Sequence, residues 1–396
     1  MSLTGRAGSP PRGVAAVSLP RGVAAALPRA EGGSVPVPPF RAAFLPATSA
    51  PPPPSPGARL LSLGLLADIQ TADIPDGASF HGAARYYRAA LDGAAAAVSS
   101  FSQDAVDAVV HLGDLLDAQA APHAEELVVK VLALLGRCEA PTYHAVGNHC
   151  LASLGRAGVN THLGPPPGRA VRRAPLLPAD PPGAGHAAPA SPPPPPLSHS
   201  YYEADLAPGV RLIVLDGFAV SLLGWPPGHP LHQLACATLA ARNPNPNKFS
   251  AEGLAGPARR YVAFGGGLGQ AQLGWLAARL QAAAAERARV IIACHLPLHP
   301  DTAPGVCLLW EYEAVLAAIE AVPPGTVIAS LAGHSHRDGA ATCSRTGTHH
   351  RVLASVLETP PGQVCHARLD LFEEAVIIRG SGVAADTWAP VVGRAM

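Results

Sequence analysis

Five short apolar runs, each ending abruptly in polar residues or glycine, mark the central part of the chain. They are Leu60–Ala67, Ala108–Leu112, Thr142–Val146, Val290–Cys294 and Val327–Ala332. Runs this short and this uniformly apolar are typical of strands that are buried on both faces. The pattern therefore predicts five core strands.

Helical and further strand patterns lie around these runs. Alanine-rich stretches predict helices at Arg85–Phe101, Ala124–Leu135 and Gln270–Ala285. Later segments predict strands at Arg211–Asp216, His350–Glu358, Val364–Phe372 and Ala375–Arg379. The combination favours an α/β protein in which two packed sheets have helices outside them.

Two proline-rich segments interrupt this pattern, at residues 1–57 and at about residues 164–196. Polyproline such as Pro192–Pro196 cannot enter a sheet or helix interior, so we expect the second segment to be a disordered surface insertion. Residues 1–57 contain five arginines and one acid, which fits either a disordered tail or an organellar transit peptide. We expect residues 58–396 to form one folded domain, and the protein to be cytoplasmic or organellar and not secreted.

Composition and charge narrow the class of partner. The 28 Lys and Arg residues balance the 28 Asp and Glu residues, so no global positive field favours nucleic acid or anionic lipid. No uninterrupted apolar run is long enough to predict a membrane span. The seven cysteines are scattered without C-x-x-C spacing, which predicts reduced thiols in place of a disulfide framework. The sequence leaves the oligomeric state open.

Metal-type ligands follow the predicted core strands. Carboxylate, amide and imidazole groups stand at five strand ends, namely Asp68, Gln70, Asp114, Asn148, His149, His295, His334 and His336. The carboxyl ends of strands are where α/β folds place ligand chemistry. A single histidine on an apolar strand is usually a core residue, but five such ends together indicate a metal centre.

These motifs resemble those of the calcineurin-like metallophosphoesterase superfamily. The matching segments are Asp68-Ile69-Gln70, Gly113-Asp114-Leu115-Leu116-Asp117, Gly147-Asn148-His149, His295 and Gly333-His334-Ser335-His336, in this order. The resemblance implies a four-layer α-β-β-α sandwich with a binuclear metal site. Two divalent ions can activate water near neutral pH and hold phosphoryl oxygens for in-line attack.

The resemblance also implies a role for each matching residue. One metal would take Asp68, Gln70, Asp114 and His336, and the other would take Asp114, Asn148, His295 and His334. Asp114 would bridge them, His149 would lie near the leaving group, and Asp117 would orient the His149 ring. Cys294 precedes His295, and strand alternation predicts that its side chain points the opposite way, into the core.

Two positions depart from the superfamily pattern. Gln70 stands where the superfamily usually has histidine, which favours Mn²⁺, or Mg²⁺, over redox iron. Cys150 stands where the superfamily commonly has an acid, so acid-assisted positioning of His149 by that residue is not expected.

Further segments resemble the manganese-dependent ADP-ribose/CDP-alcohol diphosphatase family within this superfamily. They include Gly224-Trp225-Pro226, Asn243-Pro244-Asn245, Gln272-Leu273-Gly274-Trp275-Leu276 and Glu358-Thr359. This implies hydrolysis of a small-molecule nucleoside diphosphate derivative (ADP-ribose, CDP-choline or CDP-glycerol) to a nucleoside monophosphate and a phosphorylated alcohol or sugar.

A nucleotide substrate needs a slot for its base and a positive group for phosphate. Four loop residues are candidates for the base slot, namely Phe80, Leu268, Cys307 and Trp310. The alternative is that Phe80 and Trp310 cap the core. Arg85 and Arg88 would share one face of the predicted helix and contact phosphate, or simply form a solvated face.

Two other functions share the metal ligands. One is a phosphodiesterase or phosphatase of the same superfamily that acts on other substrates, and it would differ only in the loops. The other is a non-catalytic scaffold of the same fold. Scaffolds of this kind typically lose ligands, whereas this chain keeps Asp114, Asn148, His149 and His336.

Overall fold

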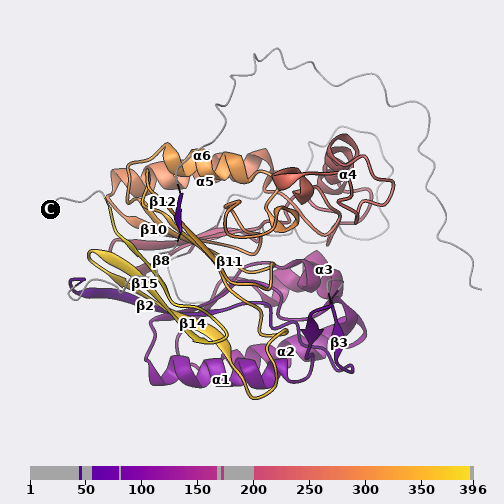
Figure 1. The fold of residues 1–396 in the computed structure, drawn as a ribbon, viewed down its shortest axis with the longest axis horizontal. Coiled ribbons are helices and arrows are strands. Elements are labelled where there is room, and N and C mark those ends of the chain that lie inside the picture. The colour runs from indigo at the N-terminus through magenta and orange to yellow at the C-terminus, as the bar shows by residue number, and fades with distance from the viewer. Residues whose placement is uncertain (1–43, 47–55, 80–81, 167–170, 174–199, 393–396) are drawn as a thin grey trace, which may run out of the picture. The chain divides into compact units, whose positions relative to one another are not determined.

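The computed structural model describes residues 44–46, 56–79, 82–166, 171–173 and 200–392. All of them belong to one compact unit, Ala42–Met396. Within it, two sheets stack face to face and helices cover both outer faces (Figure 1). This is the predicted four-layer α-β-β-α arrangement.

The six-stranded sheet has the order β16-β15-β14-β2-β5-β6. Its strands are β2 (Arg59–Leu66), β5 (Ala108–His111), β6 (Thr142–His144), β14 (Cys365–Phe372), β15 (Ala375–Gly382) and β16 (Thr387–Pro390). The strands β2, β5 and β6 pair in parallel, so their carboxyl ends meet at one edge. Helices α1 (Ala90–Gln103), α2 (Ala124–Leu135) and α3 (Asn148–His162) belong to this half.

The eight-stranded sheet has the order β1-β12-β13-β11-β10-β9-β8-β7. Its strands are β1 (Phe44–Pro46), β7 (Val171–Arg173), β8 (Tyr202–Ala207), β9 (Val210–Leu215), β10 (Arg289–Cys294), β11 (Val327–Ala332), β12 (Gly339–Cys343) and β13 (His349–Val352). Its central strands, from β9 through β10 and β11 to β13, are parallel. Helices α4 (Pro230–Arg242), α5 (Gly269–Ala285) and α6 (Tyr312–Glu320) belong to this half.

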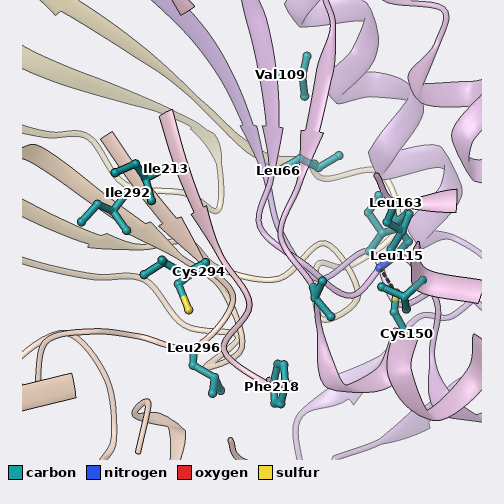
Figure 2. Packing of buried hydrophobic residues seen from close by; sticks show 14 of the residues in the cluster. Leu66, Val109, Leu115, Cys150, Leu163, Ile213, Phe218, Ile292, Cys294 and Leu296 are labelled. Carbon is teal, nitrogen blue, oxygen red and sulfur yellow. Dashed lines mark hydrogen bonds between the residues drawn. The ribbon is translucent and has the colours of Figure 1, made fainter. Parts of the chain in front are cut away.

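Alternation along the strands builds two kinds of core. Leu63 and Leu65 of β2, together with Leu212 and Val214 of β9, lie in the apolar layer between the two sheets. The residues that alternate with them in sequence, such as Leu66 and Ile213, face the helices. Figure 2 shows part of this helix-facing core, including Val109, Ile213 and Ile292. Because the strands are buried on both faces, the short uniformly apolar runs are explained.

The predicted core strands are confirmed, and two predicted boundaries were wrong. Helix α1 begins at Ala90 and not at Arg85, because Ala84–Arg85 forms β4, which pairs with β3 (Gly77–Ala78). The predicted strand His350–Glu358 is strand only as far as Val352. Helix α3 continues past Gly155, where the chain kinks with φ 65° and the helix resumes.

Two short strands lie inside segments that the sequence places outside the fold. Strand β1 pairs with β12, and β7 pairs with β8 at the opposite edge of the same sheet. Most of residues 1–57 and 164–196 lie outside the described residues, so the expectation of disorder there remains a prediction. In the described part of the chain, no helix is both long and apolar enough to cross a membrane.

Candidate metal centre

The predicted ligands lie at the carboxyl ends of parallel strands from both sheets. Asp68 and Gln70 follow β2, Asp114 follows β5, and Asn148 begins α3 after β6. From the other sheet, His295 directly follows β10, and His334 and His336 follow β11. Loops that lie far apart in sequence therefore meet in one buried cluster.

The first group of four contains Asp68, Gln70, Asp114 and His336. The Gln70 Nε2 atom lies 3.3 Å from Asp68 Oδ1, 3.3 Å from Asp114 Oδ2 and 2.8 Å from His336 Nε2. His336 Nε2 also lies 3.4 Å from Asp68 Oδ1. One side chain atom from each residue therefore points at a common centre.

The second group contains Asp114, Asn148, His295 and His334. The His295 Nε2 atom lies 3.3 Å from Asp114 Oδ2, 3.2 Å from Asn148 Oδ1 and 3.1 Å from His334 Nδ1. Asp114 Oδ2 thus faces both groups, which is the geometry of a bridging ligand. Donor atoms of Asp68, Asp114 and His295 lie within 4.8 Å of one another.

The remaining atoms of these ligands are held by the protein. Asp114 Oδ1 accepts hydrogen bonds from the backbone N–H groups of His149 (2.9 Å) and Cys150 (3.2 Å). Asp68 Oδ2 accepts from the backbone N–H of His334 (3.0 Å). Each carboxylate therefore keeps one oxygen fixed and directs the other into the cluster.

Two imidazoles have their tautomer fixed in the same way. His295 Nδ1 donates to the carbonyl oxygen of Leu112 (2.7 Å), and His336 Nδ1 donates to Glu358 Oε1 (2.8 Å). Each ring then presents the lone pair of Nε2 to the cluster. A second hydrogen bond of this kind is what orients metal-binding histidines and makes them more basic.

The backbone is strained at the ligands. Among the described residues, seven non-glycine residues have positive φ, and five of them are Asp68, Gln70, Asp114, His334 and His336. Such conformations cost about 1–3 kcal/mol each and persist where the surrounding structure demands them. At these five residues the surrounding structure requires the positive φ because their side chains converge on one centre.

Three glycines make this convergence sterically feasible. A Cβ atom on Gly147 would lie 2.0 Å from Asp114 Oδ1, and one on Gly113 would lie 2.2 Å from His295 Nδ1. A Cβ atom on Gly333 would lie 2.5 Å from Asp68 Oδ2. The glycines before Asp114, Asn148 and His334 are therefore explained by close approach of a ligand.

The charges of the cluster fit divalent cations. Burial opposes ionisation of Asp114, but the His295 charge and hydrogen bond outweigh it and lower the carboxyl pKa. Burial lowers the pKa of His336, but Asp68 and Glu358 more than compensate and raise it to about 9. Burial and the neighbouring His295 hold the pKa of His334 well below its usual value. Without an ion, the buried carboxylates are balanced by protons on His295 and His336, and a divalent cation would take the place of those protons.

Gln70 supplies a direct test of the fit to metal. Its Oε1 atom is buried and has no hydrogen-bond partner among the described residues, while Nε2 faces two carboxylates. A half-turn of the amide exchanges the two atoms and aims Oε1 at the common centre. The residues present therefore fit a bound cation.

His149 and Asp117 lie beside the ligands, as predicted. His149 Nδ1 is 3.1 Å from Asp117 Oδ2, and Asp117 is buried. The backbone N–H of Ala118 also lies 3.1 Å from Nδ1. Nδ1 serves one of these partners at a time: a protonated Nδ1 donates to Asp117, and an unprotonated Nδ1 accepts from Ala118.

Sequence comparison places the chain among known enzymes. It is 37% identical over 331 residues to the manganese-dependent ADP-ribose/CDP-alcohol diphosphatase of Oryza sativa subsp. japonica. This alignment covers 83% of this chain and 93% of that protein. It is 34% identical over 325 residues to the protein of the same name from Arabidopsis thaliana, over 81% of this chain and 94% of that one. The chain belongs to the manganese-dependent ADP-ribose/CDP-alcohol diphosphatase family.

A solved structure agrees with this family. A dimetal phosphatase from Danio rerio matches with a TM-score of 0.73 and 29% identity, covering 85% of this chain and 100% of that one. No family model matches the chain. The fold is therefore that of a dimetal phosphatase.

The two arginines predicted to contact phosphate lie in different places. Arg85 lies at the cluster, with its Nε 3.7 Å from Glu358 Oε1 and its Nη1 4.0 Å from Asp117 Oδ2. Arg88 is separate: it pairs with Asp73 at 2.6 Å, and its side chain is 60% exposed. The two arginines do not share a helix face, because both precede α1.

The residues predicted for the base slot lie in different surroundings. Trp310 is 2% exposed in an apolar cluster, and its indole N–H donates to the Arg260 carbonyl oxygen, which favours the alternative that it caps the core. Leu268 is buried in the helix-facing core, and Cys307 is half-buried in η3 (Gly305–Cys307). Phe80 lies outside the described residues.

Both cysteines beside family motifs are structural. Cys294 lies in the helix-facing core, as predicted, with its Sγ atom visible in Figure 2. Cys150 Sγ accepts a hydrogen bond from the backbone N–H of Leu115 at 3.2 Å, drawn as a dashed line in Figure 2. Burial raises the pKa of each thiol to about 12, so neither is a thiolate near neutral pH.

Sequence reasoning missed several residues around the cluster. Glu358 was matched to the family but given no role, and it now lies against His336. Phe218 and Phe264 place their rings 6.5 Å and 6.2 Å from His334. Only the family match could have singled out Glu358 and Phe264, since aromatic and acidic residues in loops carry no periodic signal.

Proposed function

We propose that this protein hydrolyses the diphosphate bond of nucleoside diphosphate derivatives, ADP-ribose and CDP-alcohols, with two manganese ions. The observation that carries the proposal is the double cluster around Asp114 Oδ2, combined with family membership. The products are a nucleoside monophosphate and a phosphorylated sugar or alcohol.

The residues divide into two metal positions. Asp68, Gln70, Asp114 and His336 would hold one ion, and Asp114, Asn148, His295 and His334 would hold the other. When bound, such a pair of cations supplies an activated water and neutralises phosphoryl charge. The chain itself fixes the ligand atoms through the backbone and Glu358 contacts, so little rearrangement is needed for binding.

His149 is suited to move a proton at the leaving oxygen. With its Nδ1 proton held by Asp117 Oδ2, the ring presents Nε2 as the atom that gives or receives a proton. The Asp117 carboxylate stabilises the imidazolium form. Burial raises and the His149 contact lowers the pKa of Asp117, with a net lowering, so Asp117 remains charged in this role.

The surroundings offer contacts for phosphate and base. Arg85 places a cation between Asp117 and Glu358, where it can bind the phosphate that is not cleaved. Phe264 lies beside His334, and Phe249, which is 62% exposed, lies 6.4 Å from Phe264. Base stacking on such rings contributes about 1–3 kcal/mol.

The test is product release from purified protein. With Mn²⁺ and ADP-ribose or CDP-choline, we expect AMP or CMP, and with Asp114→Asn we expect a loss of more than about 100-fold, because both positions lose their shared anion. Cyclic AMP and nitrophenyl phosphate serve as competing substrates. Faster turnover of either one, or no turnover with two metals bound, would contradict the diphosphatase proposal.

A further inference from the structure

A buried ion pair links the two halves of the fold beside the metal centre. Arg156 lies in α3, one residue after the kink at Gly155, and its side chain is 3% exposed. Its Nη1 pairs with Asp216 Oδ2, and its Nη2 donates to the Phe218 carbonyl oxygen at 2.8 Å. Asp216 and Phe218 belong to the loop after β9 of the eight-stranded sheet, whereas α3 follows β6 of the six-stranded sheet.

The loop end of this pair is rigidly held. Asp216 Oδ1 accepts from the Phe218 backbone N–H at 3.0 Å. The Gln272 side chain accepts from the Asp216 N–H at 2.9 Å and donates to its carbonyl oxygen at 3.0 Å. The Asp216 side chain and both of its backbone groups are therefore engaged in hydrogen bonds that stabilise the loop.

The Gly224-Trp225 motif completes the arrangement. The Arg156 guanidinium lies 4.6 Å from the Trp225 ring centroid, and the Trp225 indole donates to the Ala219 carbonyl oxygen at 3.0 Å. Trp225 thus covers Arg156 and is tied to the same loop. This gives a physical reason for a motif to which the catalytic residues assign no role.

Both ends of the ion pair lead to the same metal position. Helix α3 begins with Asn148, and the buried Phe218 ring lies 5.9 Å from the His295 ring and 6.5 Å from the His334 ring. Figure 2 shows Phe218 on the loop that β9 leads into. Among the described residues, no hydrogen bond, ion pair or ring contact joins Arg156, Asp216 or Phe218 to Asp68, Gln70 or His336.

We propose that the Arg156–Asp216 pair is a positioning clasp that sets the positions of Asn148, His295 and His334, the three ligands that the second metal position does not share with the first. The clasp acts through Phe218 and α3. It rests on the proposed two-metal function but not on the identity of the substrate. Arg156 is a positioning residue, because it touches no reacting atom.

The experiment is a Mn²⁺ titration of the metal-free full chain, with free Mn²⁺ counted by electron paramagnetic resonance. Arg156→Lys keeps a positive charge near Asp216 but cannot also hold the Phe218 carbonyl in a fixed fork. We expect one of two Mn²⁺ sites to weaken by about tenfold or more and the other to stay unchanged, as for loss of an outer-shell partner. Phe218→Leu should weaken the same site.

A double substitution to neutral residues distinguishes loss of the clasp from misfolding caused by an unpaired buried charge. Arg156→Met with Asp216→Asn leaves no unpaired buried charge and keeps the acceptor for the Phe218 N–H. It should reproduce the single-site defect. The matched control is Arg211→Lys on β9, a buried arginine that pairs with Glu203 at 3.1 Å and should leave both sites unchanged.

A reference variant identifies the affected site. In a His334→Ala background, Arg156→Lys should cause no further loss of Mn²⁺ affinity, because both changes act on one position. Any of three results would overturn the clasp proposal: equal weakening of both Mn²⁺ sites, unchanged Mn²⁺ binding in Arg156→Lys, or the same defect in Arg211→Lys. A wild-type protein that binds two Mn²⁺ but cleaves no diphosphate would refute the proposed substrate and leave the clasp proposal standing.

Discussion

At the scale of single residues, the two groups of predicted ligands share one atom, Asp114 Oδ2. Asp114 divides its two oxygens: Oδ1 is fixed by the start of α3, and Oδ2 faces both groups of ligands. The two ring nitrogens of His149 differ in the same way: Nδ1 lies against Asp117, and Nε2 is left for the proton transfer proposed above. Substitutions at these residues therefore separate metal binding from proton transfer.

His149→Ala should lower turnover without removing metal. The imidazole is not among the atoms that meet at Asp114 Oδ2, so its loss removes the proton donor alone. We expect kcat to fall by about 10²–10⁴-fold, the usual contribution of a general acid or base. Metal content per protein, measured by elemental analysis, should equal that of the wild type, and a parallel loss of metal would show that the assigned role is wrong.

Arg85→Gln should weaken substrate binding, and Arg88→Gln should not. Arg85 lies between Asp117 and Glu358 at the cluster, whereas Arg88 is an exposed partner of Asp73. Loss of a charged hydrogen bond costs about 1.5–3 kcal/mol, or roughly 10- to 100-fold in kcat/KM. Steady-state kinetics with ADP-ribose measure this, and equal effects of the two substitutions would contradict the assignment.

At the scale of elements, the turn between strand and ligand matters most. Strand ends deliver the ligands, and the glycines at positions 113, 147 and 333 let the neighbouring side chains approach the backbone. The element that serves most functions is α3: it begins with Asn148 and His149 and carries Arg156 beyond its kink. One helix thus carries a proposed ligand, the proposed proton-transfer residue and the link to the opposite sheet.

Gly147→Ala should disrupt the centre, and Gly274→Ala should stabilise the fold. A Cβ atom at Gly147 meets Asp114 Oδ1 at 2.0 Å, whereas one at Gly274, inside α5, meets no heavy atom within 4 Å. We expect Gly147→Ala to lose about 1–3 kcal/mol of stability together with Mn²⁺ binding. Gly274→Ala should gain about 0.5–1 kcal/mol. Chemical denaturation and Mn²⁺ titration test both, and normal Mn²⁺ binding by Gly147→Ala would contradict the close approach.

At the scale of the whole molecule, buried imidazoles outside the metal centre tie stability to pH. Burial lowers the pKa of His144 to about 4, and burial together with the Arg351 charge lowers that of His349 to about 3. Both values lie below the ordinary value of 6.5. The unfolded chain therefore takes up protons at a pH where the folded chain does not.

The free energy of unfolding should accordingly fall as the pH drops below 6.5 towards these values. In this pH window each such imidazole lowers the free energy of unfolding by up to about 1.4 kcal/mol per pH unit. Above pH 6.5 it has no such effect. His349 bonds the hydroxyls of Thr342 and Thr387, each at 2.9 Å, so His349→Gln keeps similar partners without a titrating group. Denaturation at pH 7 and pH 5 should show a smaller loss for His349→Gln, and an equal loss would contradict the assignment.

The core strands and the polar residues at their ends could be predicted from the sequence alone. Apolar runs and the polar residues that follow them are local features, and parallel pairing brings their carboxyl ends together whatever the loops do. The positions of Asp68, Asp114, His295 and His334 could therefore be predicted before any coordinates. The start of α1 was wrong because helix propensity does not register the β3–β4 hairpin that occupies Arg85.

Which residues surround the proposed ligands could be learned only from the three-dimensional packing. Glu358 meets His336 and Arg156 meets Asp216 across 22 and 60 residues of sequence, through loops with no periodic pattern. A buried arginine and an exposed one look alike in sequence, and only packing separates Arg156 from Arg88. The ligands follow from local chain order, whereas their support depends on contacts that exist only after both sheets have stacked.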